Sequence, residues 1–597
     1  MVTELESPPI TQTAAEPRPE AQAKTATGPL GEIALSFSGG GYRATAFHLG
    51  VLDMLNELKL LPDIRALSTV SGGTFTGLMF AVWVAESENL DNFADGFRAK
   101  LETFLQETNV INLAFANIAQ QKRRPSLIRA AAQIYASEGM LGEHKFALLL
   151  NSDKPQLAEL AFNATEFTGG NSFRFVKSRN PKAVIGTNDY RLEKEVAEKI
   201  RLADIAAASS CFPGAFEPLR YPQDFHDADK LIKETKAQRI IKAQAWRDNR
   251  TESLTKAEEW LKTAPPEQTA AAEAQVVAAK EQLAQAETNL AEARKLHKVQ
   301  EIDLMDGGIY DNQGFYSINL IYSRENAPPP GLYIMSDTSP RTRHIFQFPK
   351  AQPKSWFRIT LDKLVPLYWL LCLGSIIIAA TSLYNWYNSY AVPRNAGWHL
   401  DPFVLYGLPF LVAVVVLGLL WKVRGLFKDL LEKAQAEAEV DLWPYIKNLS
   451  QTELVDLGMS RASSTLKLTS TIFMKRIRGM VQKEVVDFKP LKGHYQFALI
   501  YHLAEIGVKP PDSLPEWLRP NLRLQKLSKA AEDVATKLWF TEKEVMQMKD
   551  VIECGRATLC FNLLRYLLAK HTETDLLNTA FASVYADAKA AWMKLNV

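Results

Sequence analysis

The sequence predicts an α/β fold: a three-layer core around a parallel-rich sheet, with a helical coiled-coil insertion, two transmembrane helices and a helical C-terminal region. The core is predicted by short apolar strand patterns that end in glycine or serine turns and continue as apolar helix patterns. A strand, helix, strand order of this kind forms a right-handed crossover in a parallel sheet. The two membrane spans are predicted by two long stretches without charged side chains.

The first crossover carries two turns that we expect to face each other at one edge of the sheet. Residues Ile33–Ser38 alternate apolar and small side chains and lead into Gly39, Gly40, Gly41, Tyr42 and Arg43. The second strand ends in Thr69-Val70-Ser71-Gly72-Gly73, followed by an apolar helix pattern. A sharp strand-to-helix turn exposes its serine and tolerates only small neighbours, and N–H groups of the next helix point where an oxyanion would form.

Two other interpretations of these turns stay open from their residues alone. Serine and glycine can simply mark a loop. Three successive glycines can also cradle a phosphate, although neither Gly-x-x-x-x-Gly-Lys-Ser/Thr nor a complete Gly-x-Gly-x-x-Gly pattern is present.

A carboxylate further along the chain is the candidate base. The strand pattern Glu301–Met305 delivers Asp306, and Gly307 and Gly308 allow the backbone to turn tightly. A carboxylate at the same sheet edge could accept the serine proton. An ordinary Asp-Gly turn is the alternative. We expect structural roles for three other titratable residues near the motifs. Asp303 is a charge on the strand face, Asp311 is a turn residue, and His48 is a packing or solvent-facing side chain.

Together with the small-residue segment Ala206–Phe216, these motifs resemble those of the patatin-like phospholipases over about residues 30 to 340. The resemblance implies a Ser71–Asp306 dyad, a covalent acyl-enzyme, and an oxyanion held by Gly39, Gly40 and Gly41 with the Gly72 N–H. It also marks Arg43, Gly73, Gly307 and Gly308 as motif positions, and it implies neither a cofactor nor a metal. Thr69 and Ala44 depart from the family pattern, which has glycine at both places.

The expected organisation is a disordered tail (1–28), a catalytic domain (29–345), a helical hairpin inserted within it (228–300), a transmembrane hairpin (364–422) and a helical C-terminal region (423–597). The segment Leu332–Ser336 is the last core strand expected. The insertion is rich in alanine and charged residues, and Pro265-Pro266 divides it. Its seam at Val276, Leu283 and Leu290 predicts a coiled coil, which could bind a protein partner, self-associate or act as a spacer.

The apolar stretches Leu364–Ala391 and Pro402–Trp421 predict a membrane hairpin, with a buried soluble helix pair as the alternative. Lysines and arginines flank the hairpin on both outer sides, which predicts that the catalytic and C-terminal regions are cytosolic. Four cysteines in 597 residues are consistent with a reducing compartment, and a net charge of +2 argues against nucleic-acid binding. A basic cluster at Lys122–Arg124 is a solvated helix face or an anionic-lipid contact.

We therefore expect a membrane-anchored lipid acyl hydrolase of the phospholipase A or lysophospholipase type. Two alternatives remain. One is a catalytically inactive membrane scaffold that acts through the helical hairpin 228–300, which we call the arm. The departures from the family pattern at Thr69 and Ala44 are the reason to keep this alternative. The other is an acyltransferase that passes the acyl group to an alcohol other than water.

Overall fold

The computed structural model describes residues 28–118, 125–213, 215–295, 299–324, 327–341, 360–389, 403–438, 444 and 447–597. The expected tail 1–28, except for its last residue, and the basic cluster Lys122–Arg124 lie outside these residues. The chain divides into two compact units. The larger unit joins the residues before position 344 to Phe473–Val597, and the second unit is His344–Ile472.

A mixed ten-stranded sheet forms the centre of the larger unit, and the α/β core with a parallel-rich sheet that the sequence predicts is confirmed. Strands β10, β9, β1, β2 and β3 run parallel in that spatial order, and strands β4, β5 and β6 continue the sheet in antiparallel fashion. The strands are β1 (Ile33–Phe37), β2 (Ile64–Val70), β3 (Glu159–Glu166), β4 (Asn171–Lys177), β5 (Ile185–Gly186), β6 (Arg191–Leu192), β7 (Leu219–Tyr221), β8 (Ile302–Asp306), β9 (Leu332–Asp337) and β10 (Tyr495–Leu499).

One edge of β3 explains how the two candidate catalytic residues meet. Strand β2 pairs with the first part of β3 and ends with Val70 opposite Asn163. Strand β8 runs antiparallel to β3 and ends with Asp306 opposite Ala164, the next residue along. The C-terminal ends of β2 and β8 therefore approach each other head-on. The sequence predicts that Asp306 lies at the same sheet edge as Ser71. In the structure it does, although β8, which carries Asp306, runs antiparallel to β2, which leads to Ser71.

Helices cover both faces of the sheet because the strand side chains alternate between them. Ile33, Leu35 and Phe37 pack in one core with α1 and α2, whereas Ala34 packs on the other side with α12 and α17. The helices of this unit are α1 (Gly41–Glu57), α2 (Gly72–Glu86), α3 (Ala99–Glu107), α4 (Val110–Ile118), α5 (Leu127–Tyr135), α6 (Ala147–Leu150), α7 (Lys194–Ala197), α8 (Leu202–Ser210), α11 (Gly308–Asp311), α12 (Phe315–Tyr322), α17 (Met474–Asp487), α18 (His502–Val508), α19 (Leu522–Asp533), α20 (Val545–Lys570), α21 (Glu573–Leu577) and α22 (Ala582–Leu595).

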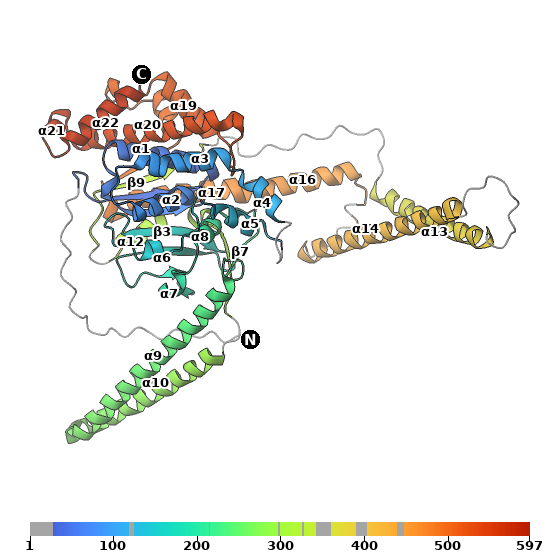
Figure 1. Ribbon diagram of the computed structural model, residues 1–597, viewed down its shortest axis with the longest axis horizontal. Helices are drawn as coiled ribbons and strands as arrows, with labels where there is room; N and C mark the ends of the chain where they lie inside the picture. The colour runs from blue at the N-terminus through green and yellow to red at the C-terminus, as the bar shows by residue number, and fades with distance from the viewer. Residues whose placement is uncertain are drawn as a thin grey trace. The chain divides into compact units, whose positions relative to one another are not determined.

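The C-terminal region is mostly helical, but it is also part of this core. Strand β10 adds to the sheet beside β9, so Leu332–Ser336 does not mark the last core strand. Helix α20 lies along α1 (Figure 1). A Cβ atom at Gly50 would come within 2.0 Å of the Ile552 carbonyl oxygen, and one at Gly555 within 2.2 Å of the Phe47 carbonyl oxygen. Residues 473–597, which are most of the helical C-terminal region expected at 423–597, belong to the same compact unit as the expected catalytic domain.

The predicted insertion is a pair of long helices, α9 (Ala228–Thr263) and α10 (Thr269–Lys295), that run side by side (Figure 1). A short 3₁₀ turn, Pro266–Gln268, joins them at the predicted proline break. In the seam, Val276 and Leu290 are buried and Leu283 is half-buried. Most other buried positions between the helices are alanines, which bury little apolar surface.

The second unit contains two long apolar helices, α13 (Leu361–Ser389) and α14 (Leu408–Ala438), followed by α16 (Gln451–Lys467). The segments Asp362–Asn388 and Val404–Leu426 are long and apolar enough to cross a membrane, and only 11% of the residues in each apolar window are buried. Of the two predicted spans, the ends at Ala391 and Pro402 lie outside the described residues.

Candidate active site

Ser71 occupies a strained turn between β2 and α2. Its backbone has φ = 50° and ψ = −122°, a region that residues with a side chain rarely adopt. Helix α2 begins at the next residue, Gly72, where a Cβ atom would lie 2.1 Å from the Gly41 carbonyl oxygen. The predicted strand-to-helix turn is thus present, and its two glycines are required because neighbouring backbone leaves no room for side chains.

A buried serine from another element holds this turn in place. Ser209, near the end of α8, accepts a hydrogen bond from the Ser71 N–H at 3.0 Å and donates one to the Asn163 carbonyl at 2.7 Å. Its hydroxyl also bonds the Thr74 hydroxyl at 2.8 Å. Ser209 lies in the small-residue segment Ala206–Phe216, but no pattern in the sequence indicates that this residue contacts the turn.

Asp306 is fully enclosed at the end of β8. One carboxylate oxygen, Oδ1, accepts the Gly308 N–H at 2.7 Å, and the residue's own N–H donates to the Cys211 carbonyl at 3.0 Å. The other oxygen, Oδ2, is buried and has no hydrogen-bond partner among the residues that the structure describes. Burial raises the pKa of Asp306 to about 6, although the Ser71 hydroxyl and the Gly308 N–H partly oppose this shift.

These features suit Asp306 to accept a proton from Ser71. A buried carboxylate with a free oxygen costs stability, and such costs are characteristic of functional sites. The Ser71 side chain is close enough to lower the pKa of Asp306, but the pair does not form a hydrogen bond of ordinary geometry. Catalytic hydrogen bonds are often long before substrate binds. A pKa near 6 leaves the carboxylate mostly ionised at neutral pH.

The glycine loop lies against Ser71, as the sequence predicted. A Cβ atom at Gly39 would be 3.1 Å from the Ser71 Cβ. The N–H of Gly39 donates to the Asn312 carbonyl at 3.0 Å, so it is not available to an oxyanion. Within the described residues, the N–H groups of Gly40, Gly41 and Gly72 have no acceptor. We expected four oxyanion donors, the N–H groups of Gly39, Gly40, Gly41 and Gly72. All of these except the Gly39 N–H are available.

The departure at Thr69 has a structural compensation. The Thr69 methyl group would be 2.4 Å from a Cβ atom at Gly77, one turn into α2, so this helix has a glycine where Thr69 needs space. The Thr69 hydroxyl bonds Thr74 at 3.0 Å. We therefore find no crowding at Thr69 in the turn. Ala44 is likewise accommodated in α1, where it is buried.

The competing titratable residues have structural partners. Asp311 accepts the backbone N–H groups of Gln313 and Tyr316 at 2.9 and 2.7 Å, as a turn residue does. Asp303 is half-buried on β8, opposite Arg220. His48 is fully buried: its Nε2 donates to the Ser38 carbonyl at 2.9 Å, its Nδ1 bonds Ser336 at 2.8 Å, and burial lowers its pKa to about 3. His48 is therefore a neutral packing residue.

Part of the chain matches a known protein family. The family model described as patatin-like phospholipase matches residues 35–232. These residues form a patatin-like phospholipase domain. Comparison with curated proteins gives no match for the chain. At the family level, the patatin-like domain supports a lipid acyl hydrolase.

The match spans only part of the site. It includes the glycine loop, the Ser71 turn and Ser209, and it ends in the first turns of α9. Asp306 lies outside the matched residues. Its assignment as the base is therefore supported by its position at the end of β8 and by the motif resemblance described above.

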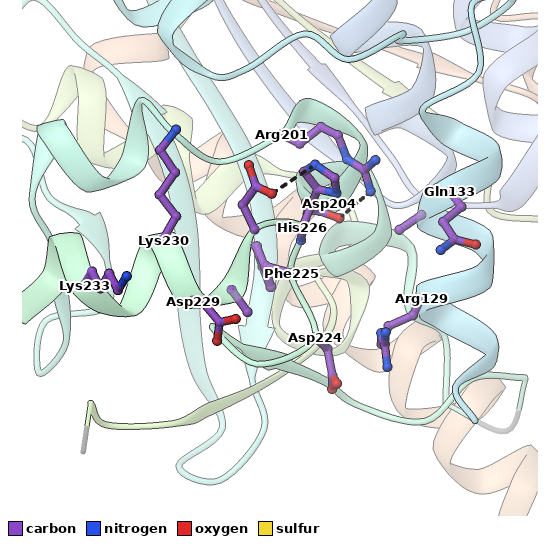
Figure 2. Close-up of a pocket in the computed structure, with 13 residues that line it drawn as sticks. Arg129, Gln133, Arg201, Asp204, Asp224, Phe225, His226, Asp229, Lys230 and Lys233 are labelled. Carbon is purple, nitrogen blue, oxygen red and sulfur yellow. Dashed lines mark hydrogen bonds and ion pairs between the residues drawn. The ribbon is translucent and has the colours of Figure 1, made fainter. Parts of the chain in front are cut away.

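A separate polar pocket of about 590 Å³ lies at the start of α9, and neither Ser71 nor Asp306 lines it (Figure 2). Arg201 and Asp204, at the start of α8, form an ion pair there at 3.2 Å, and His226 pairs with Asp227 at 3.4 Å. Both signs of charge are represented among its lining residues, so it has no clear ligand class. The described residues contain no group of three or more His, Cys, Asp or Glu side chains that could hold a metal.

Proposed function

We propose that this protein is a membrane-anchored serine hydrolase that cleaves carboxylic esters of membrane lipids with Ser71 as nucleophile and Asp306 as base. The observation that carries the proposal is the strained Ser71 beside a buried carboxylate whose Oδ2 has no partner and whose pKa is raised to about 6. The patatin-like domain supports the same reaction class.

In the acylation step, the Ser71 hydroxyl oxygen attacks the ester carbonyl carbon while its proton passes to Asp306 Oδ2. The N–H groups of Gly40, Gly41 and Gly72 stabilise the negative charge that develops on the carbonyl oxygen. The tetrahedral intermediate collapses, the bond to the alcohol breaks, and the proton on Asp306 passes to the leaving alkoxide. The acyl group is then esterified to Ser71.

In the deacylation step, Asp306 accepts a proton from water, which attacks the acyl carbonyl. The acyl-enzyme bond breaks, the proton returns to the Ser71 oxygen, and a free fatty acid is released. The same carboxylate thus serves as base in one half-reaction and acid in the other, as microscopic reversibility requires.

Two features support a membrane lipid as the substrate. The patatin-like domain is a lipid hydrolase domain at the family level. The exposed apolar helices α13 and α14 would tether the site to a bilayer, which raises the effective concentration of acyl chains at the site. We also propose, from the flanking lysines and arginines, that both the catalytic and the C-terminal regions face the cytosol.

The test is active-site labelling of the full-length protein in detergent. We expect a fluorophosphonate probe to label the wild type at Ser71 and to leave Ser71→Ala unlabelled and inactive on a soluble ester, at equal expression. An unlabelled, inactive wild type would favour the scaffold. Transfer of the acyl group to an added alcohol in preference to water would favour the acyltransferase.

A further inference from the structure

The glycine loop is held by a segment almost 500 residues away in the sequence. Residues 534–540, which we call the clasp, connect α19 to the next 3₁₀ turn. The Lys537 carbonyl accepts the Tyr42 N–H at 2.9 Å, and the Val534 carbonyl accepts an Arg43 guanidinium hydrogen bond at 2.7 Å. The Phe540 ring lies 5.9 Å from the Tyr42 ring.

The loop conformation depends on this contact. Gly40 and Gly41 have φ values of 143° and 56°, which only glycine adopts without penalty. A Cβ atom at Gly41 would be 2.6 Å from the Lys537 carbonyl oxygen, so the loop and the clasp touch through their backbones. Because glycine has access to many other backbone conformations, contacts from the surrounding structure are needed to hold the loop in this one.

Arg43 is the side chain that joins the two segments. It is 5% exposed, and its guanidinium also approaches the Glu532 carbonyl at 3.4 Å. Burial lowers the pKa of Arg43 to about 10, while the nearby carboxylates Asp337 and Glu532 oppose this. Backbone carbonyls at the start of the clasp therefore satisfy a charge that would otherwise be buried without acceptors.

The clasp acts at the point where orientation of the donors matters. The Tyr42 N–H is bonded to Lys537, whereas the preceding N–H groups of Gly40 and Gly41 have no acceptor within the described residues. Fixing Tyr42 and Arg43 fixes the direction of the two preceding amides relative to Ser71. A donor contributes to an oxyanion site only when its N–H group lies within about 0.5 Å of the productive position and points at the oxyanion.

We propose that the clasp and Arg43 are positioning elements of the active site, which hold the Gly40 and Gly41 amides in the geometry that stabilises the oxyanion. This inference rests on the proposed serine hydrolase function. It makes the C-terminal region a working part of the site, although the family match ends at residue 232.

The test compares Arg43→Met, Arg43→Lys and Glu544→Gln in the full-length protein on a soluble ester. Arg43→Met removes the link, and Arg43→Lys keeps a donor for Val534. Glu544→Gln acts from the clasp side, because the Glu544 carboxylate pairs with the Lys537 ammonium at 2.5 Å. The matched control is Glu573→Gln, which removes a different ion pair of the C-terminal region, that with Lys589.

We expect Arg43→Met to lower kcat about 10- to 100-fold with KM nearly unchanged, because loss of one oxyanion donor costs about 100- to 1000-fold and misalignment costs less. Binding of a trifluoromethyl ketone, which becomes tetrahedral on Ser71, should weaken by the same factor as kcat/KM. Arg43→Lys should recover much of the loss, Glu544→Gln should lower kcat several-fold, and Glu573→Gln should match the wild type.

The inference is wrong if folded Arg43→Met and Glu544→Gln keep wild-type kcat, or if their losses appear in KM without weaker ketone binding. If Arg43→Met does not fold, Glu544→Gln alone decides the matter. Fluorophosphonate labelling separates this failure from failure of the proposed function. If the wild type is labelled at Ser71 and the variants keep full activity, the positioning role of the clasp is wrong and the serine hydrolase function stands.

Discussion

Replacing Asp306 by asparagine should lower activity by orders of magnitude and yet stabilise the protein at pH 8. The side chains have nearly the same shape, and the asparagine oxygen can still accept the Gly308 N–H that bonds Asp306 Oδ1 at 2.7 Å. The substitution removes the buried charge on Oδ2, which has no partner. A buried polar group without a partner destabilises the folded state, and a charged one does so more strongly.

The size of the effect follows from the pKa of Asp306, which burial raises from 3.8 to about 6. Each pKa unit corresponds to about 1.4 kcal/mol, so ionised Asp306 costs the folded state about 3 kcal/mol at pH 8. A raised folded-state pKa means that this cost disappears as pH falls and the folded carboxyl gains a proton. The stability advantage of Asp306→Asn should therefore shrink to about half at pH 5.

The assay is thermal unfolding in detergent at pH 5 and pH 8, paired with ester hydrolysis. We expect Asp306→Asn to melt several degrees above the wild type at pH 8, with a smaller difference at pH 5. Its kcat should fall about 100- to 10,000-fold, the usual cost of losing a general base. Wild-type activity should rise with pH through about 6, where Asp306 ionises.

Asp303→Asn is the matched control, since Asp303 lies on the same strand but is only half-buried and faces Arg220. It should change neither activity nor the pH dependence of melting appreciably. Lower stability of Asp306→Asn than of the wild type at pH 8, or a stability difference that does not depend on pH, would contradict a destabilising charge on Asp306. An active Asp306→Asn would contradict the assignment of Asp306 as the base.

Three further predictions concern the turn, the arm and the topology. Gly77→Ala should destabilise the Ser71 turn and lower activity, because its Cβ would meet the Thr69 methyl group at 2.4 Å; adding Thr69→Ser, which removes that methyl group, should restore melting temperature and activity. Replacing residues 230–299 with a short Gly/Ser linker should keep activity on a soluble ester, and complete loss in a folded protein would mean that the arm shapes the site. A cysteine at Asn395 should react with an impermeant thiol reagent in intact cells and one at Ser450 only after lysis; labelling at Ser450 in intact cells would contradict the cytosolic topology.

Local sequence patterns predicted the α/β core well, because each pattern reflects a local physical requirement of a strand, a turn or a helix. The alternation in Ile33–Ser38 and the glycines after it mark a strand and its turn, and β1 ends at Phe37 with α1 beginning at Gly41. Pro265-Pro266 marks the end of α9, and the 3₁₀ turn lies there. Such patterns depend on neighbours a few residues apart, so they can be identified without the rest of the chain.

Contacts between distant segments could not be predicted in this way. The hydroxyl of Ser209 is an ordinary small side chain until α8 brings it to the Ser71 N–H. The space that Thr69 needs is provided by Gly77, which faces it only once α2 is folded. Strand β10 has the pattern of a short strand among helices, and only its pairing with β9 shows that it belongs to the core.

The position of these contacts bears on how much of the chain the reaction requires. The patatin-like match covers 35–232, but Asp306 comes after the arm and the clasp comes after the apolar helices. Strand β9, which pairs with β1 at the start of the glycine loop, is itself paired with β10 on its other edge. Helix α1, which begins in that loop, packs on α20 without space for a methyl group at Gly50. A fragment that ended near residue 345 would expose the edge of β9 and the packed face of α1, two of the elements that position the loop beside Ser71.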